Sequence, residues 1–151
     1  MARADLEPAK GRVCVALLGP LAVSVGGVDR GIGSRSQRRA LAVLAVSAPG
    51  VVSADRLADV LWSGVLPRSW SSSLQTYISR LRAVLGPGAL TSHPTGNALS
   101  VDADDIDLVR FEATATLAVR TVGQPEVALV RSEEALALWR GRPLAEFADE
   151  E

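Results

Sequence analysis

The stretch Ser-Trp-Ser-Ser-Ser-Leu-Gln-Thr-Tyr-Ile-Ser-Arg-Leu-Arg-Ala-Val-Leu, residues 69–85, decides how the rest of this chain is interpreted. Each residue of an α-helix turns by about 100° from the last. One narrow stripe, with Trp70 at its edge, then collects the large apolar side chains: Leu74, Ile78, Leu81 and Leu85. The opposite face carries small hydroxyls and one guanidinium: Ser69, Ser72, Ser73, Thr76, Ser79 and Arg80. The spacing predicts a helix over 69–85 with one buried side and one polar side.

The polar side of this helix has two interpretations. Small polar side chains let a helix approach a partner closely, and an arginine among them can reach a phosphate or the O6 and N7 edge of guanine. A DNA recognition helix needs these properties. The alternative is an ordinary solvent-facing helix. Serine costs roughly half a kcal/mol per residue relative to alanine in a helix, and a plain solvent face would more often carry Glu, Lys or Ala.

A small antiparallel sheet is predicted near the start of the chain. Two short apolar runs, residues 13–18 and 21–25, are separated by Gly19-Pro20, a dipeptide typical of tight turns, and a weak third strand is predicted near residues 28–32. Residues 1–12 are polar and lack the apolar stretch of a signal peptide. They are therefore interpreted as a flexible tail.

Two helices are predicted between this sheet and the long helix. One covers residues 40–48 and the other covers residues 54–62. Serines that can cap the free amides of a first turn precede both helices: Ser34 or Ser36 for the first, and Ser53 for the second.

A hairpin is predicted after the long helix, which Gly86-Pro87-Gly88 ends. Residues 89–92 and 98–101 flank a turn-rich tip, so the hairpin forms a wing. The order of strands, three helices and hairpin is that of an α+β winged helix-turn-helix, here assigned to residues 13–101.

The composition changes after Val101. Residues 102–107 are acidic and are interpreted as a solvated linker or a cap, and residues 108–122 and 126–139 are predicted to be helices. The inward faces are expected to carry Leu108, Phe111, Ala115 and Val119 on the first helix, and Leu129, Ser132, Leu136 and Trp139 on the second. Residues 102–151 are thus expected to form a helical hairpin, one unit of a possible helical repeat.

The net charge of −1 conceals an asymmetry. Residues 1–101 carry eleven basic and five acidic side chains, whereas residues 102–151 carry five arginines and twelve acids. Three of the arginines, Arg35, Arg38 and Arg39, open the helix that leads into residues 40–48, where positive charge opposes the helix dipole unless a phosphate docks there. A solvated charge cluster is the alternative for these three residues.

The sequence offers little for catalysis or cofactor binding. Cys14 is the only cysteine and His93 the only histidine, so neither a disulfide, a cysteine-rich zinc site nor a well-supported Ser-His-Asp triad is expected. The glycines of residues 27–33 lack dinucleotide or Walker spacing. We expect no enzyme activity, no metal and no cofactor. No apolar run of 18 residues exists, so no membrane span is expected, and a cytoplasmic protein is predicted.

Six blocks of sequence, in order over most of the chain, resemble the Streptomyces antibiotic regulatory protein family of transcriptional activators. They are Leu-Leu-Gly-Pro-Leu at 17–21, Ser-Gln-Arg-Arg-Ala-Leu-Ala at 36–42, Ser-Ala-Asp-Arg-Leu-Ala-Asp-Val-Leu-Trp at 53–62, Leu-Gln-Thr-Tyr-Ile-Ser-Arg-Leu-Arg at 74–82, Asp-Leu-Val-Arg-Phe-Glu at 107–112 and Ala-Leu-Ala-Leu-Trp-Arg-Gly at 135–141. The resemblance implies an OmpR/PhoB-type winged helix followed by the start of a bacterial transcriptional activator domain.

The resemblance also implies partners and residue roles. An activator of this family binds direct repeats of double-stranded DNA beside a promoter as a pair of molecules, and contacts RNA polymerase holoenzyme. By position, the residues that would face bases or nearby phosphates are Ser72, Ser73, Thr76, Tyr77 and Arg80. The residues that would hold the DNA backbone are Arg35, Arg38, Arg39, Arg68 and Arg82, with a minor phosphate role for His93. Residues 63–68 match the loop that touches polymerase.

Three features depart from the family pattern. The wing reads Gly-Asn-Ala-Leu at 96–99 where the family usually has Gly-Tyr-x-Leu, the loop 63–68 contains no acid, and the activator domain is about a third of the usual length. A second hypothesis is a protein-interaction module whose working surface is the C-terminal helical hairpin, with Phe111 and Trp139 in the interface.

Overall fold

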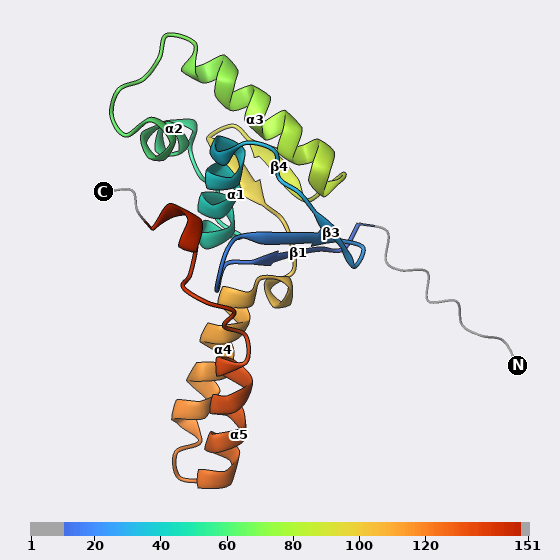
Figure 1. Cartoon of the computed structure of the whole chain (residues 1–151), viewed down its shortest axis with the longest axis vertical. Helices are drawn as coiled ribbons and strands as arrows, with labels where there is room; N and C mark the ends of the chain where they lie inside the picture. Colours follow the sequence, from blue (N-terminus) through green and yellow to red (C-terminus); the bar gives the residue numbers. More distant parts are fainter. Residues whose placement is uncertain (1–10, 149–151) are drawn as a thin grey trace, which may run out of the picture. The chain divides into compact units, whose positions relative to one another are not determined.

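The computed structural model describes residues 11–148 (Figure 1). Its elements are β1 (Val13–Ala16), β2 (Ala22–Val25), β3 (Val28–Arg30), α1 (Arg35–Ser47), α2 (Ala54–Trp62), α3 (Trp70–Leu85), β4 (Leu90–His93), β5 (Gly96–Leu99), a 3-10 turn η1 (Ala103–Asp105), α4 (Asp107–Arg120), α5 (Pro125–Leu136) and a second turn η2 (Ala145–Phe147). The chain divides into two compact units, and each is described by itself. Most of the expected flexible tail, and the final acidic residues, lie outside the described residues.

The first unit contains residues 23–101 and the residues up to Cys14, and it has the predicted winged-helix order. The amino-terminal sheet has the strand order β1-β2-β3, and β2 pairs with β3 in antiparallel register, Val25 opposite Val28. The hairpin β4–β5 is also antiparallel, with Leu90 opposite Leu99 at its base and His93 opposite Gly96 at its tip. The predicted α+β fold is confirmed.

The core of this unit confirms the apolar stripe expected on the long helix. Leu74, Ile78, Leu81 and Leu85 of α3 are all buried, at 5% exposure or less. The other large side chains fully enclosed in this unit come from α1, α2 and the hairpin: Leu41, Leu44, Leu57 and Leu99. Burial of this one stripe leaves the opposite side of α3 in solvent.

Serine caps fix where the first two helices begin. The hydroxyl of Ser34 accepts a hydrogen bond from the Gln37 amide at 3.2 Å, and the hydroxyl of Ser53 accepts one from the Arg56 amide at 3.1 Å. Of the two caps considered for α1, the structure uses Ser34. Each cap satisfies an amide that the helix itself leaves unpaired, and a cap of this kind stabilises a helix by about 1 kcal/mol.

The hairpin is attached to the segment between α1 and α2. The amide of Val52 donates to the Asn97 carbonyl at 2.7 Å, and the Asn97 amide donates to the Val52 carbonyl at 3.0 Å. Gly96 lies so close to this bridge that a Cβ there would stand 2.0 Å from the Val52 oxygen. Only glycine fits at position 96 while this pairing is kept.

The second unit contains residues 15–22 together with the chain from Asp102 onward. Helices α4 and α5 form the predicted helical hairpin, and the side chains buried in it are small, Ala118 and Ala135. Phe111 and Trp139 form an edge-to-face pair with ring centroids 5.2 Å apart.

The expected inward faces of this hairpin are partly wrong. Val119, Leu129 and Leu136 were expected to face inward, yet their side chains are 73%, 59% and 65% exposed. The helices meet instead at the alanines, which lie beside those positions on each helix. Small residues allow closer approach of two backbones, and the larger side chains are left outside.

Residues 15–22 were assigned to the winged helix, but their contacts place them in the second unit. The Asp107 carboxylate accepts hydrogen bonds from the amides of Leu17 and Leu18 at 2.7 and 3.0 Å, and the Glu146 carboxylate accepts one from the Leu21 amide at 2.7 Å. Arg140 adds a bond from its amide to the Leu18 carbonyl, 2.7 Å, and one from its guanidinium to the Pro20 carbonyl, 2.7 Å.

The interpretation of residues 102–107 as a solvated linker is also wrong in part. Asp105 is 7% exposed, and Asp107 opens α4 with its carboxylate on the two amides just described. A carboxylate at a helix start is favourable for the helix dipole as well. Over residues 11–148, no helix is both long enough and apolar enough to cross a membrane.

Candidate nucleic-acid interface

The polar side of α3 is open to solvent along its length. The residues exposed on it are Ser71, Ser72, Gln75, Thr76, Ser79, Arg80 and Ala83. They lie opposite the buried stripe, as the helical spacing predicts, while Ser73 at the margin is half-buried. We call this set, Ser71 to Ala83, the open face of α3.

The hydroxyls of the open face are partly committed to the helix itself. Ser72 donates to the Ser69 carbonyl at 3.0 Å, and Thr76 donates to the Ser72 carbonyl at 3.0 Å. Each hydroxyl proton is thereby used, and its oxygen lone pairs still point outward as acceptors. These two residues present a shallow, acceptor-rich surface.

Two long side chains of the open face supply the donors. Among residues 11–148, neither Arg80 nor Gln75 forms a side-chain hydrogen bond or ion pair with another residue. Arg80 was predicted from the sequence and Gln75 was missed. Gln75 is three residues after Ser72 and four before Ser79, so the same helical spacing could have identified it. An exposed glutamine can pair with the N6 and N7 atoms of adenine, as arginine does with guanine.

Tyr77 lies at the edge of the open face rather than in it. Its ring is half-buried and stacks on Trp62 of α2, with centroids 6.2 Å apart and planes 25° apart. The stack fixes the direction of the phenol, and the base or phosphate contact expected for Tyr77 stays a prediction.

A groove of about 480 Å³ separates α3 from the hairpin. We call it the wing groove; its walls are formed by the α3 residues Ser71, Gln75, Ser79 and Arg82 and by hairpin residues 92–97. His93, the exposed histidine of the wing, lies on this wall, with its Nε2 atom 3.0 Å from the Thr91 hydroxyl. The groove therefore has polar side chains on both sides.

Arg82 leaves the open face and turns to the hairpin. Its Nε donates to the Leu90 carbonyl at 3.2 Å, and its Nη2 donates to the Ser92 hydroxyl and to the Asn97 Oδ1, the latter at 3.4 Å. The side chain is half-buried. The structure thus brings Arg82 to the wing groove as a residue bonded to the wing.

The remaining arginines of the expected site lie on other elements. Arg35, Arg38 and Arg39 belong to the first turns of α1, where Arg35 is exposed and the other two are half-buried. Burial, together with the nearby charge of Arg35, lowers the pKa of Arg39. Arg68 is exposed in the segment between α2 and α3. That segment also exposes Val65, at 83%.

The chemistry of the open face and wing groove is that of recognition. In the described part of the chain, no group of three or more His, Cys, Asp or Glu side chains is arranged to hold a metal ion. Hydroxyl, amide, imidazole and guanidinium groups instead line a helix face and its adjoining groove. These groups match the phosphate oxygens and base edges of a nucleic acid.

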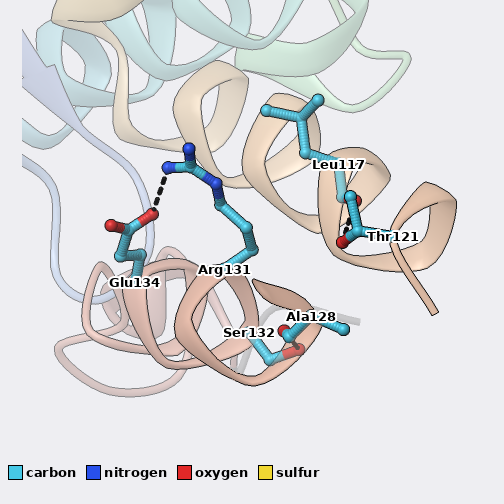
Figure 2. Close-up of polar contacts among 6 residues, drawn as sticks. All are labelled: Leu117, Thr121, Ala128, Arg131, Ser132 and Glu134. Carbon is cyan, nitrogen blue, oxygen red and sulfur yellow. Dashed lines mark hydrogen bonds and ion pairs between the residues drawn. The ribbon is translucent and has the colours of Figure 1, made fainter. Parts of the chain in front are cut away.

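The helical hairpin of the second unit offers a different surface. Figure 2 shows its polar groups satisfied close at hand: Thr121 donates to the Leu117 carbonyl at 2.8 Å, Ser132 to the Ala128 carbonyl at 2.8 Å, and Arg131 pairs with Glu134 at 2.8 Å. Large apolar side chains of α4, α5 and their flanks remain exposed: Leu117, Val119, Val122, Val127, Leu129, Val130, Leu136 and Trp139.

Comparison with known proteins finds regulators. No family model matches the chain. The chain is 33% identical over 146 residues to the transcriptional regulatory protein EmbR of Mycobacterium tuberculosis, a match that covers 91% of this chain and 38% of EmbR. It is 33% identical over 142 residues to the regulatory protein AfsR of Streptomyces coelicolor, covering 92% of this chain and 14% of AfsR. It is 32% identical over 143 residues to DnrI of Streptomyces peucetius, covering 86% and 53%.

A solved structure agrees with these matches. Mycobacterium tuberculosis EmbR, in complex with a low-affinity phosphopeptide, superimposes with a TM-score of 0.85 and 32% identity, over 91% of this chain and 38% of EmbR. The chain therefore spans well under two thirds of the length of each of these relatives.

Proposed function

We propose that this chain, which belongs to the Streptomyces antibiotic regulatory protein family of transcriptional regulators, binds specific sequences of double-stranded DNA through its winged helix and activates transcription. The open face of α3 enters the major groove, and the hairpin meets the neighbouring backbone or minor groove. A cytoplasmic location follows from this role.

One observation carries the proposal. α3 presents a face of small polar side chains with two unengaged long donors, Arg80 and Gln75, beside a polar groove. A helix that only faced solvent would gain nothing from four serine or threonine residues, which are poor helix formers. The same residues leave room for base edges and offer hydrogen bonds to them.

The proposal assigns roles within the interface. Arg80 reads guanine and Gln75 reads adenine, while the base edges or phosphates around them meet Ser72, Ser73, Thr76 and Tyr77. The phosphate contacts come from Arg35, Arg38, Arg39, Arg68 and, at the wing, His93. Phosphate contacts set affinity and register, whereas the two long side chains of α3 set sequence preference.

The arrangement on the promoter is also part of the proposal. Two molecules bind a direct repeat side by side, and residues 63–68 contact RNA polymerase holoenzyme. Exposed Val65 and Leu66 in that loop supply apolar contact area that acids supply elsewhere in the family. No cofactor or metal takes part.

Footprinting on promoter DNA at two salt concentrations tests the proposal. We expect a repeated protected half-site and an affinity that falls steeply as salt rises, because bound arginines release counterions from the phosphates. Equal affinity for cognate and scrambled duplexes would remove sequence-specific recognition. Absence of any binding at low salt would remove the DNA-binding function altogether.

A second candidate function is a protein-interaction module based on the helical hairpin. Its exposed apolar side chains, such as Val119 and Leu129, favour this reading, because scattered charge rather than apolar area is usual on a plain surface. It predicts a partner interface that is insensitive to salt. Replacement of Val119 and Leu129 by serine would weaken that interface and leave duplex binding unchanged.

A further inference from the structure

We propose that Arg82 is a positioning residue: it ties both strands of the hairpin to α3 and so sets the width of the wing groove. This inference rests on the proposed DNA-binding function, because the tie affects recognition only if α3 and the hairpin grip DNA together. It gives Arg82 a role different from the direct phosphate contact expected from the sequence.

The tie spans the hairpin from one strand to the other. From the fourth turn of α3, the guanidinium reaches the Leu90 carbonyl and the Ser92 hydroxyl on β4, and the Asn97 side-chain oxygen on β5. The Ser92 hydroxyl also donates to the Asn97 Oδ1 at 3.3 Å. A planar fork of donors is needed to serve three acceptors in these directions, and arginine alone among the side chains supplies it.

The hairpin needs such a tie. Each strand has four residues, and an isolated two-stranded hairpin is marginally stable in water. Its base is held by buried Leu90 and Leu99 and by the backbone bridge to Val52, but residues 92–95 are exposed. Arg82 is the α3 side chain that bonds to the hairpin beyond its buried base, so the direction of the tip depends on it.

The charge on Arg82 strengthens the tie without a partner carboxylate. None of the residues that line the wing groove is acidic, so the guanidinium keeps its positive charge next to the site of a polyanion. Hydrogen bonds donated by a charged group are roughly twice as strong as neutral ones. The tie holds the wing in place and leaves the groove attractive to phosphate.

Hydrogen exchange in the free protein tests the tie without DNA. Arg82→Lys keeps the charge but loses the fork, and Asn97→Ala removes one acceptor and touches no cation. We expect hairpin amides in both variants to exchange about tenfold faster, the loss of one hydrogen bond to a charged group. Arg80→Lys, the same change on a side chain with no bond inside the protein, is the matched control and should leave the hairpin amides unchanged.

The effect on DNA is measured on the same variants. Arg82→Lys and Asn97→Ala should both lose protection at the wing side of the footprint, keep it where α3 lies, and give a double variant no weaker than either single one. The salt slope should stay unchanged, because no phosphate contact is removed.

Two results separate the possible failures. Unchanged hairpin exchange in Arg82→Lys and Asn97→Ala would overturn the tie, whatever the DNA result. Faster exchange in a protein whose wild-type form binds no duplex would overturn the proposed function and, with it, the role of Arg82 in recognition. A salt slope that falls by about one in Arg82→Ala, with unchanged exchange, would return Arg82 to the phosphate role.

Discussion

Helix α3 and the hairpin α4–α5 solve opposite problems with similar lengths of helix. α3 buries every large aliphatic side chain of one stripe and exposes hydroxyls, an amide and a guanidinium. The hairpin buries alanines and exposes valines and leucines. One helix keeps its apolar residues for the protein's own core, whereas the pair of helices displays them.

The difference indicates two kinds of partner. A polar face of small residues suits the hydrated edges of a nucleic acid, and interfaces with DNA are more polar than those with protein. An apolar surface on a helical pair suits another protein surface. The two units of the chain are thus chemically suited to different tasks, in line with the charge difference between residues 1–101 and 102–151.

Removing a leucine from each helix breaks the comparison most directly. Leu81 of α3 is fully buried, and Leu136 of α5 is 65% exposed. We expect Leu81→Ala to lower the free energy of unfolding by about 2–5 kcal/mol, and Leu136→Ala to change it by less than about 0.5 kcal/mol. Urea unfolding followed by circular dichroism measures both, and similar losses would show that the exposed side chain is packed in solution.

Asp107 tests what holds residues 15–22 in the second unit. Asp107→Ala removes two hydrogen bonds to a charged group, each worth about 1.5 kcal/mol, so we expect a loss of about 3 kcal/mol in unfolding free energy. Exchange of the Leu17 and Leu18 amides should rise in parallel. Asp102→Ala, at an exposed position, is the control, and a loss as large there would point to net charge as the cause.

Arg80 sharpens the functional side of the comparison. On cognate duplex we expect Arg80→Ala to cost about 1–3 kcal/mol of binding free energy, with little change on a scrambled duplex, because a base contact is lost. Arg38→Ala should instead weaken binding to both duplexes and reduce the salt slope by about one. Titrations by fluorescence anisotropy at several salt concentrations distinguish the two patterns; identical patterns would contradict the assignment of Arg80 to base reading.

The smallest effect is expected at the ion pair on α5. Arg131 and Glu134 are about half exposed, and a pair of this kind on a helix surface contributes about 0.3 kcal/mol. Arg131→Ala should therefore lower the unfolding midpoint barely, and the difference should disappear in high salt. A large loss would show that Arg131 packs against more than its partner carboxylate.

The winged helix could be predicted because its signals are local. Leucines at helical spacing, serine caps and glycine-proline stops each act within a few residues, and they identified α3, the capped helices and the hairpin. Four residues between Leu74 and Leu85 were enough to orient α3, since the remaining face followed by rotation. Gln75 was missed although the same rotation places it on the open face.

The helical hairpin was harder to predict for a physical reason. Alanine and valine occur on every side of α4 and α5, so no single stripe stands out, and packing on small residues reversed the expected faces at Val119 and Leu129. The bonds of Asp107 to Leu17 and Leu18 join residues about ninety positions apart. No local pattern marks such a pairing, and the same is true of the bonds between Arg82 and the hairpin.

The placement of residues 15–22 has a consequence for any attempt to exchange parts between regulators of this kind. The polypeptide visits the second unit twice, so one cut at position 101 does not separate the halves. A fragment ending there would carry Leu17, Leu18 and Leu21 stripped of their cover, an adhesive strip prone to aggregation. Grafting the acidic half onto another reader of DNA would require transplanting this early octapeptide with it.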